Sequence, residues 1–123
     1  MKALATYAKQ LGWLHTKPEG SELTRLQLYN QWDDWPNDLE SVSYLITAAL
    51  GLRLGVPTDK GGLLPHKWSD VVSYAKEVAC LTEPWEINTL MDMSEGYVNE
   101  FMNGRDPLRT SPMDIWRRER NGS

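Results

Sequence analysis

The side chains that most often carry out acid–base, nucleophilic or metal chemistry are few in this sequence and far apart. Neither His15 nor His66 belongs to an HExxH or Cys/His pattern of the kind that binds zinc. A catalytic triad would require one of these histidines to meet a serine or Cys80, the single cysteine, in space. Cys80 follows an apolar segment, so we expect a buried, inert thiol and not a nucleophile.

Two further segments contain residue types that bind ions. Asp33, Asp34 and Asp38 offer oxygen ligands of the kind that Mg²⁺ and Ca²⁺ prefer, but they lack EF-hand spacing, which favours roles in turns and helix caps. The segment 59–62 (DKGG) resembles a phosphate-binding loop only in part, since it lacks the GxxxxGK[ST] pattern, and a flexible turn is expected. The sequence therefore predicts no catalytic residue, no metal and no cofactor, and a protein that is not an enzyme.

The element best placed to organise these residues is a helix expected over 82–104. Thr82 is the expected N-cap, Pro84 lies in the first turn, and Gly104 is expected to end the helix in a left-handed conformation. Its apolar positions recur every three or four residues: Ile87, Leu90, Met91, Ser94, Tyr97, Val98 and Phe101. The face outside this stripe is predicted to be acidic: Glu83, Glu86, Asp92, Glu95 and Glu100. Gly96, in mid-helix, predicts a close contact with another helix.

The remaining pattern predicts an all-α fold, a compact single-domain bundle of about five helices plus a short C-terminal helix. The other helices are expected over 2–14, 21–32, 38–54 and 67–81, with residues 1–110 as the helical domain and 111–123 as a short C-terminal helix and tail.

Local signals set the details of these helices. Ser21 is the expected cap of the second helix, and Asn37 with Glu40 forms a capping-box-like start for the third. The third helix should be the most buried, with Tyr44 and Leu50 widening its apolar stripe and Gly55 following its end.

Two shorter expectations concern the fourth helix and the loop before it. Trp68 and Val78 are expected to point inward from the fourth helix. The segment 56–65 is expected to be a loop, without strands, that Leu63 and Leu64 fix to the core.

Methionine and aromatic residues suggest a surface for a protein partner. Met93 and Met102 fall outside the main apolar stripe of the 82–104 helix, so they are expected to leave apolar surface exposed. Methionine-rich surfaces adapt to different partners, and tryptophan is frequent at interfaces. The expected partner-binding residues are Trp85, Met93, Tyr97, Met102 and Trp116.

Charge and hydropathy limit the other partners and the compartment. The net charge of −4 argues against general nucleic-acid binding, which requires a basic surface. The fourth and fifth helices could form a helix-turn-helix, but the second would carry acids and no base. The sequence has no signal-peptide core and no apolar stretch of membrane-spanning length, so we expect a cytoplasmic protein without a membrane partner.

Three segments also carry a resemblance to a known family. The sequences EPWEINTLMDM (83–93) followed by Tyr97, SPMDIW (111–116) and WPNDLE (35–40) are similar to those of small helical proteins of tailed bacteriophages, and most of all to tail assembly chaperones. The resemblance implies a non-enzymatic protein in the host cytoplasm that binds the apolar helical tape measure protein during virion assembly and prevents its aggregation. A homo-oligomer is compatible with it, and it transfers no residue roles.

A different class of function remains open. The C-terminal region holds a cluster of arginines that could contact phosphates: Arg105, Arg109, Arg117, Arg118 and Arg120. The alternative reading is therefore a DNA-associated regulator or packaging component.

Overall fold

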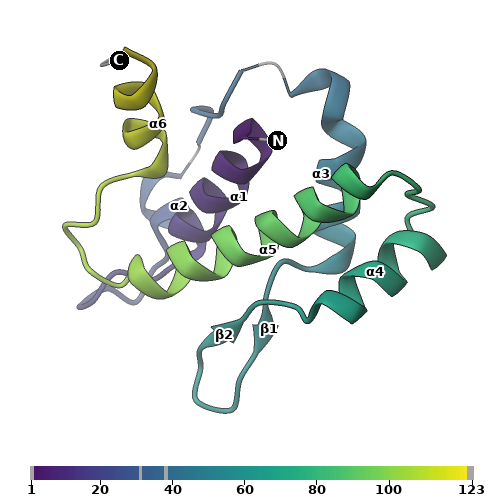
Figure 1. The fold of residues 1–123 in the computed structure, drawn as a ribbon. Helices are drawn as coiled ribbons and strands as arrows, with labels where there is room; N and C mark the ends of the chain where they lie inside the picture. The colour runs from purple at the N-terminus through teal and green to yellow at the C-terminus, as the bar shows by residue number, and fades with distance from the viewer. Residues whose placement is uncertain (1, 31, 38, 122–123) are drawn as a thin grey trace.

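Helices dominate the architecture, and they pack around one long helix (Figure 1). The computed structural model describes residues 2–30, 32–37 and 39–121, with side chains through residue 119. The helices are α1 (Lys2–His15), α2 (Arg25–Tyr29), α3 (Ser43–Leu52), α4 (Trp68–Glu77), α5 (Pro84–Asn103) and α6 (Pro112–Asn121). A 3₁₀ turn, η1 (Glu40–Val42), precedes α3, and β1 (Val56–Pro57) pairs with β2 (Leu63–Leu64). The predicted all-α class is confirmed, apart from this small hairpin.

The pair α1 and α5 forms the centre of the fold, and the two helices lie side by side in Figure 1. Gly12 on α1 faces the backbone of Tyr97 on α5, where no β-carbon would fit. Gly96 is buried against Lys9 and Ala5 of α1, which confirms the close helix contact predicted for this glycine. Two small residues thus let the helices approach at their crossing point.

The ends of α5 differ from the prediction. The N-cap is Glu83 and not Thr82, because Glu83 and Glu86 form a capping box in which the Glu86 carboxylate accepts the Glu83 N–H at 3.1 Å. At the other end, Gly104 has a φ of −68° and stays right-handed, so the expected left-handed cap is wrong. Glycine is needed there for space, since a β-carbon would lie 2.6 Å from the Glu100 carbonyl oxygen.

The core is built from α1, α3, α4 and α5. Its buried members include Leu4, Leu45, Val71 and Leu90. Met93 is also 0% exposed, so the expectation that it leaves the buried face is wrong. The buried face of α5 is wider than the predicted stripe, because helices pack on more than one side of it.

The acidic face of α5 is only partly exposed. Glu83, Asp92 and Glu95 face outward as predicted, but Glu86 and Glu100 are buried. Each buried carboxylate is compensated: Glu86 accepts the Tyr44 hydroxyl at 2.6 Å in addition to its capping bond, and Glu100 pairs with an arginine described below. The prediction of a wholly acidic outer face is therefore wrong for two of its five positions.

Helix α3 is shorter and more exposed than predicted. It begins at Ser43 after η1, whose N-cap Leu39 makes no side-chain capping bond, so the capping box expected from Asn37 and Glu40 is absent from the described residues. Tyr44 and Leu50 are exposed, so this is not the most buried helix. Its C-cap is Arg53 and not a glycine.

Helix α2 begins later than predicted. Thr24 caps it, and Gln27 completes a capping box, so Ser21 is not the cap. The helix ends at Tyr29, which is exposed like Leu28 before it. Five residues form the helix, of which only Arg25 is buried.

The segment 56–64 forms a hairpin that the sequence did not predict. Val56 pairs with Leu64 and Pro57 with Leu63 in antiparallel register. The strands are two residues long, too short to show alternation. Leu63 packs against Gly55, whereas Leu64 is 59% exposed and does not fix the hairpin to the core.

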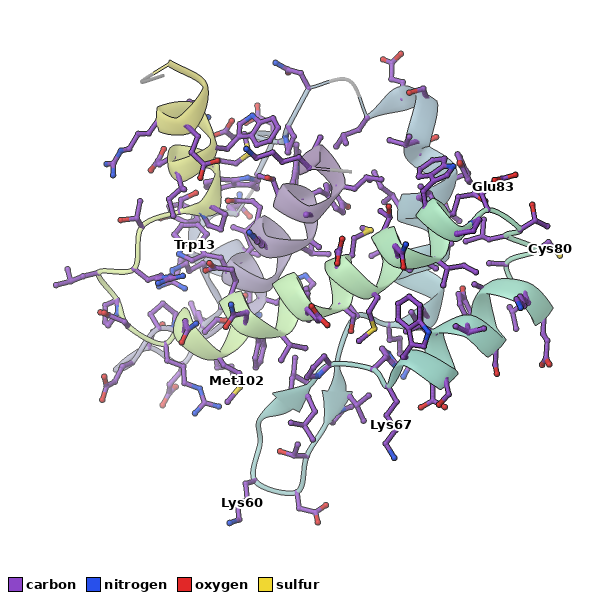
Figure 2. The ribbon with its side chains drawn as sticks, in the orientation of Figure 1. Trp13, Lys60, Lys67, Cys80, Glu83 and Met102 are labelled. Carbon is purple, nitrogen blue, oxygen red and sulfur yellow. The ribbon has the colours of Figure 1, made fainter. Side chains whose placement is uncertain are left out.

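The region around α4 contains three wrong predictions of burial. Trp68 and Val78 are exposed, and so is Cys80, which was expected to be buried. Helix α4 ends at Glu77, and the chain then turns toward α5 with Cys80 at a positive φ of 56°. Figure 2 shows Cys80 in this connection, near Glu83 at the start of α5.

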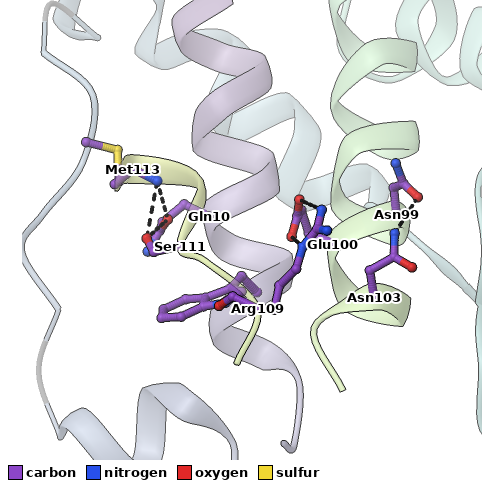
Figure 3. A network of polar contacts seen from close by, with 8 residues as sticks. Gln10, Asn99, Glu100, Asn103, Arg109, Ser111 and Met113 are labelled. Atoms are coloured by element: carbon purple, nitrogen blue, oxygen red, sulfur yellow. Dashed lines mark hydrogen bonds and ion pairs between the residues drawn. The ribbon is translucent and has the colours of Figure 1, made fainter. Parts of the chain in front are cut away.

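Helix α6 docks on α1 through a buried polar contact (Figure 3). The side-chain oxygen of Gln10 accepts hydrogen bonds from the Ser111 hydroxyl and the Met113 N–H, both at 3.0 Å. Ser111 precedes the first residue of α6, and its hydroxyl also accepts the Met113 N–H at 3.2 Å. The C-terminal helix is thereby attached to the N-terminal one.

Candidate functional site

An apolar cleft lies where α1, α5, the end of α3 and the hairpin meet. Its volume is about 240 Å³. Leu11 and His15 come from the last turns of α1, and Tyr97 comes from α5. The end of α3 and the hairpin complete it: Leu50, Arg53, Leu54, Gly55 and Leu63. We refer to these eight residues as the apolar cleft.

The close approach of α1 and α5 places the polar pair of the cleft. Because Gly12 allows the backbone of Tyr97 to approach α1, the Tyr97 hydroxyl reaches Nδ1 of His15, three residues further along α1, at 2.6 Å. The rings meet edge to face, with centroids 5.6 Å apart. Burial lowers the pKa of His15 and raises the pKa of Tyr97, because it disfavours both charged forms. Both groups are therefore neutral near pH 7.

Buried Ser94 on α5 connects two segments next to the cleft through hydrogen bonds. Its hydroxyl donates to the Leu54 carbonyl at 2.7 Å and accepts the backbone N–H of His66 at 3.1 Å. The His66 ring, through Nε2, contacts the carbonyl oxygen of Arg53. One serine on α5 thus fixes the segment after α3 against the segment before α4, so the cleft is preformed.

The rim of the cleft carries one cation, Arg53. Its backbone has a φ of 65° and a ψ of 118°, a conformation that suits glycine far better than a residue with a β-carbon. The side chain is exposed. Within the described part of the chain, no carboxylate forms an ion pair with it.

The size of the apolar cleft matches a side chain better than a free cofactor. Small-molecule sites usually enclose about 300–1,000 Å³, whereas a dry cavity of about 150 Å³ accepts benzene. A hollow of about 240 Å³ accordingly holds one large apolar side chain. Leu50, which is 52% exposed, extends the apolar surface outward from the cleft.

A second hollow, of about 330 Å³, lies between α1, α5 and α6 and is more polar. Arg109 at its wall forms two hydrogen bonds with the Glu100 carboxylate, the shorter at 2.8 Å (Figure 3). Lys2 pairs with Glu119 at 3.4 Å. These acids offset two of the cations that line it, so the hollow has no strong charge of either sign.

The structure does not bring the five predicted partner-binding residues into one surface. Met93 is buried, Tyr97 lines the apolar cleft, and Trp116 lines the second hollow. Trp85 and Met102 are partly exposed but lie at opposite ends of α5, roughly 25 Å apart at 1.5 Å per residue. Figure 2 shows Met102 near the C-terminal end of this helix.

The residues that sequence reasoning missed are Leu11, Leu50, Arg53 and Leu63. The available signal was the crowding of leucine and glycine around a single arginine in residues 50–55 (LGLRLG), followed by the Leu63-Leu64 pair. Nothing in that pattern indicated that the last turn of α1 would lie beside it.

Ion pairs within the protein engage several of the residues that the sequence suggested for binding metal ions or phosphates. Asp34 forms an ion pair with Arg117 of α6, and Arg117 also pairs with Asp114 on the same helix at 3.0 Å. Asp38 lies outside the described residues. The described residues include no group of three acids, histidines or cysteines that could hold a metal ion. Of the C-terminal arginines, Arg109 and Arg117 are engaged by carboxylates, and the side chain of Arg120 lies outside the description.

The comparisons with known proteins add no relative. The chain matches no protein-family model, no curated protein and no solved structure. Among the described helices, none has the length and apolar character needed to cross a membrane.

Proposed function

We propose that the protein is a non-enzymatic binding module that receives a large apolar side chain of a protein partner in the apolar cleft. The observation that carries this proposal is a preformed hollow of about 240 Å³ walled by leucines and the Tyr97 ring, beside the exposed side chain of Leu50. Protein interfaces often depend on one large anchor that enters such a pocket and is shielded there from water.

The polar groups of the cleft suit binding better than catalysis. The His15 ring and the Tyr97 hydroxyl are hydrogen-bonded to one another, and among the described residues no serine, cysteine or carboxylate lines the hollow with them. A histidine whose pKa is lowered by burial, next to a tyrosine whose pKa is raised, forms a neutral edge to an apolar site. Such an edge orients a partner without attracting ions.

We further propose that this binding serves bacteriophage tail assembly in the host cytoplasm, with the tape measure protein as partner. The support is the resemblance of residues 35–40, 83–93 and 111–116 to tail assembly chaperones. A tape measure protein is a long helical chain with many apolar side chains, so it would supply anchors for the cleft.

Co-expression with a tape measure protein tests this proposal. The wild-type protein should raise the amount of partner recovered in the soluble fraction and remain bound to it in a pull-down. Leu50→Glu should abolish both effects, because it places a charge at the edge of the apolar cleft. Leu64→Glu is the matched control: this side chain is also exposed but does not line the cleft.

Two results would contradict the proposal at different levels. Unchanged recovery of the partner with the wild-type protein would refute the tape measure as partner. Equal loss with Leu50→Glu and Leu64→Glu would refute the cleft as the binding site.

A further inference from the structure

We infer that Arg53 selects the occupant of the apolar cleft, and that the occupant is a polypeptide segment with a large apolar side chain next to an acidic one. This inference rests on the proposed function and adds the chemistry of the partner. Arg53 lies at the rim of the hollow and at the end of α3.

The backbone of Arg53 adopts an unusual conformation. Its φ of 65° with a ψ of 118° is costly for any residue with a β-carbon. Glycine would be the ordinary choice, and the chain has a glycine two positions before, at Gly51, and two positions after, at Gly55. An arginine at a position that favours glycine is unfavourable for the backbone, so a use for its side chain outside the fold would offset that cost.

The fold makes no ion pair with the charge of Arg53 within the described residues. The helix end is closed by its backbone, whose N–H contacts the carbonyls of Ala49 and Leu50, and whose carbonyl contacts His66. Its guanidinium forms no ion pair within the described residues. This contrasts with Arg109 and Arg117, which both pair with carboxylates.

The apolar cleft and the guanidinium of Arg53 together are complementary to an apolar side chain next to an acidic one. The hollow beside Arg53 has room for one large apolar side chain, and the other polar edge, His15 with Tyr97, is neutral. A guanidinium recognises a carboxylate through two parallel hydrogen bonds, which fixes direction as well as charge. An aspartate or glutamate beside the anchor would therefore meet Arg53 as the anchor enters the cleft.

Two capped peptides that differ by one charge test this inference: acetyl-Phe-Glu-amide and acetyl-Phe-Gln-amide. Binding is followed by chemical-shift titration of the ¹⁵N-labelled protein at low salt. Both peptides should shift the amide signals of the cleft, and the acidic one should bind ~2- to 5-fold more tightly, as expected for one exposed charge pair. Arg53→Gln should remove this preference, so that the two peptides bind equally, whereas Arg53→Lys should retain part of it.

Arg53→Gly gives an independent readout. It should raise the melting temperature by relieving the backbone and abolish the preference for the acidic peptide at the same time. Cys80→Gly is the matched control, because it relieves another positive φ far from the cleft lining and should raise the melting temperature without changing peptide preference.

The outcomes separate this inference from the proposed function. If neither peptide shifts the cleft signals, the apolar cleft is not a binding site and the proposed function fails. If both peptides bind equally to the wild-type protein, the cleft stands and the role of Arg53 is refuted. A lower melting temperature for Arg53→Gly would show that the arginine supports the fold, which would also overturn the inference.

Discussion

Gly12 on α1 lies directly against the backbone of Tyr97 on α5. A β-carbon at Gly12 would lie 3.1 Å from the Tyr97 carbonyl carbon and 3.2 Å from its α-carbon, and closer still to the carbonyl oxygen. Backbone atoms cannot swing aside as a flexible side chain can, so this contact sets the distance between the two central helices. It also brings the Tyr97 hydroxyl to His15 at the apolar cleft.

Gly12→Ala should therefore destabilise the fold strongly. Overpacking a tight contact costs typically 1–3 kcal/mol, and we expect a loss of about 2–3 kcal/mol in the free energy of unfolding. Gly96→Ala is the matched control on the partner helix: its β-carbon would meet Cγ of the Lys9 side chain at 3.0 Å, which can shift where backbone cannot. Replacing a mid-helix glycine offsets up to about 1 kcal/mol, so we expect a clearly smaller loss. Urea unfolding of both variants checks this, and equal losses would contradict it.

The ion pair of Glu100 and Arg109 should be worth more than a surface pair. Glu100 is 5% exposed, so Arg109→Met would leave a buried carboxylate without its partner. Because Arg109 is itself partly exposed and water can replace it, we expect a loss of about 1–3 kcal/mol. The double variant Glu100→Met with Arg109→Met should recover part of that loss. A thermodynamic cycle measures the coupling, and strictly additive losses would argue against it.

The lowered pKa of His15 predicts a pH-dependent stability. In the folded state burial disfavours the charged ring, so the unfolded chain binds the proton more tightly. The free energy of unfolding therefore includes the full contribution of neutral His15 above the ordinary histidine pKa of about 6.5. This contribution is lost as the pH falls from there through the lowered pKa. His15→Gln, which preserves a polar partner for Tyr97, should flatten the profile between about pH 7 and pH 5.5.

Urea titrations of the wild-type protein and His15→Gln across this range provide the comparison. Carboxylate titrations are common to both proteins and cancel in the difference. A difference that stays constant with pH would show that His15 does not carry this dependence.

The elements of this fold could be predicted where one helical pattern repeats over several turns. Helix α5 and its contact at Gly96 follow from the spacing of apolar residues and from the cost of a mid-helix glycine. Cap residues were harder, because Thr82 is the ordinary N-cap type, and only the reciprocal bonds between Glu83 and Glu86 in the folded helix place the cap one residue later. The prediction of which side chains are buried was wrong where α5 packs against helices on a second side, as it does at Met93.

The apolar cleft could not be predicted, because it depends on contacts between distant segments. Leu11 and His15 meet Arg53 and Leu63 only after α1 and α5 have packed at Gly12. The positive φ of Arg53 has no local signature either, since sequence patterns place glycine at such positions. Of the aromatic and methionine residues that the sequence pattern predicted to bind a partner, only Tyr97 lines the apolar cleft.

Gln10 should control the docking of α6. It is fully buried on α1, and its side-chain oxygen accepts both the Ser111 hydroxyl and the Met113 N–H (Figure 3). Its Nε2 has no hydrogen-bond partner among the described residues, so part of the side chain's polarity is already uncompensated. In Gln10→Leu the two donors lose their acceptor, although the Met113 N–H keeps the Ser111 hydroxyl, so we expect a loss of about 1–2 kcal/mol confined to α6.

Amide hydrogen exchange checks this prediction directly. In Gln10→Leu, exchange should accelerate at Met113 and Ile115 while the amides of Leu90 and Met93 in the core of α5 keep their protection, because local opening requires less free energy than global unfolding. Gln27→Leu, on the exposed side of α2, is a control that removes a glutamine without touching α6. Equal acceleration in α5 and α6 would instead show that Gln10 supports the whole core, because the C-terminal helix would then open only when α1 and α5 separate.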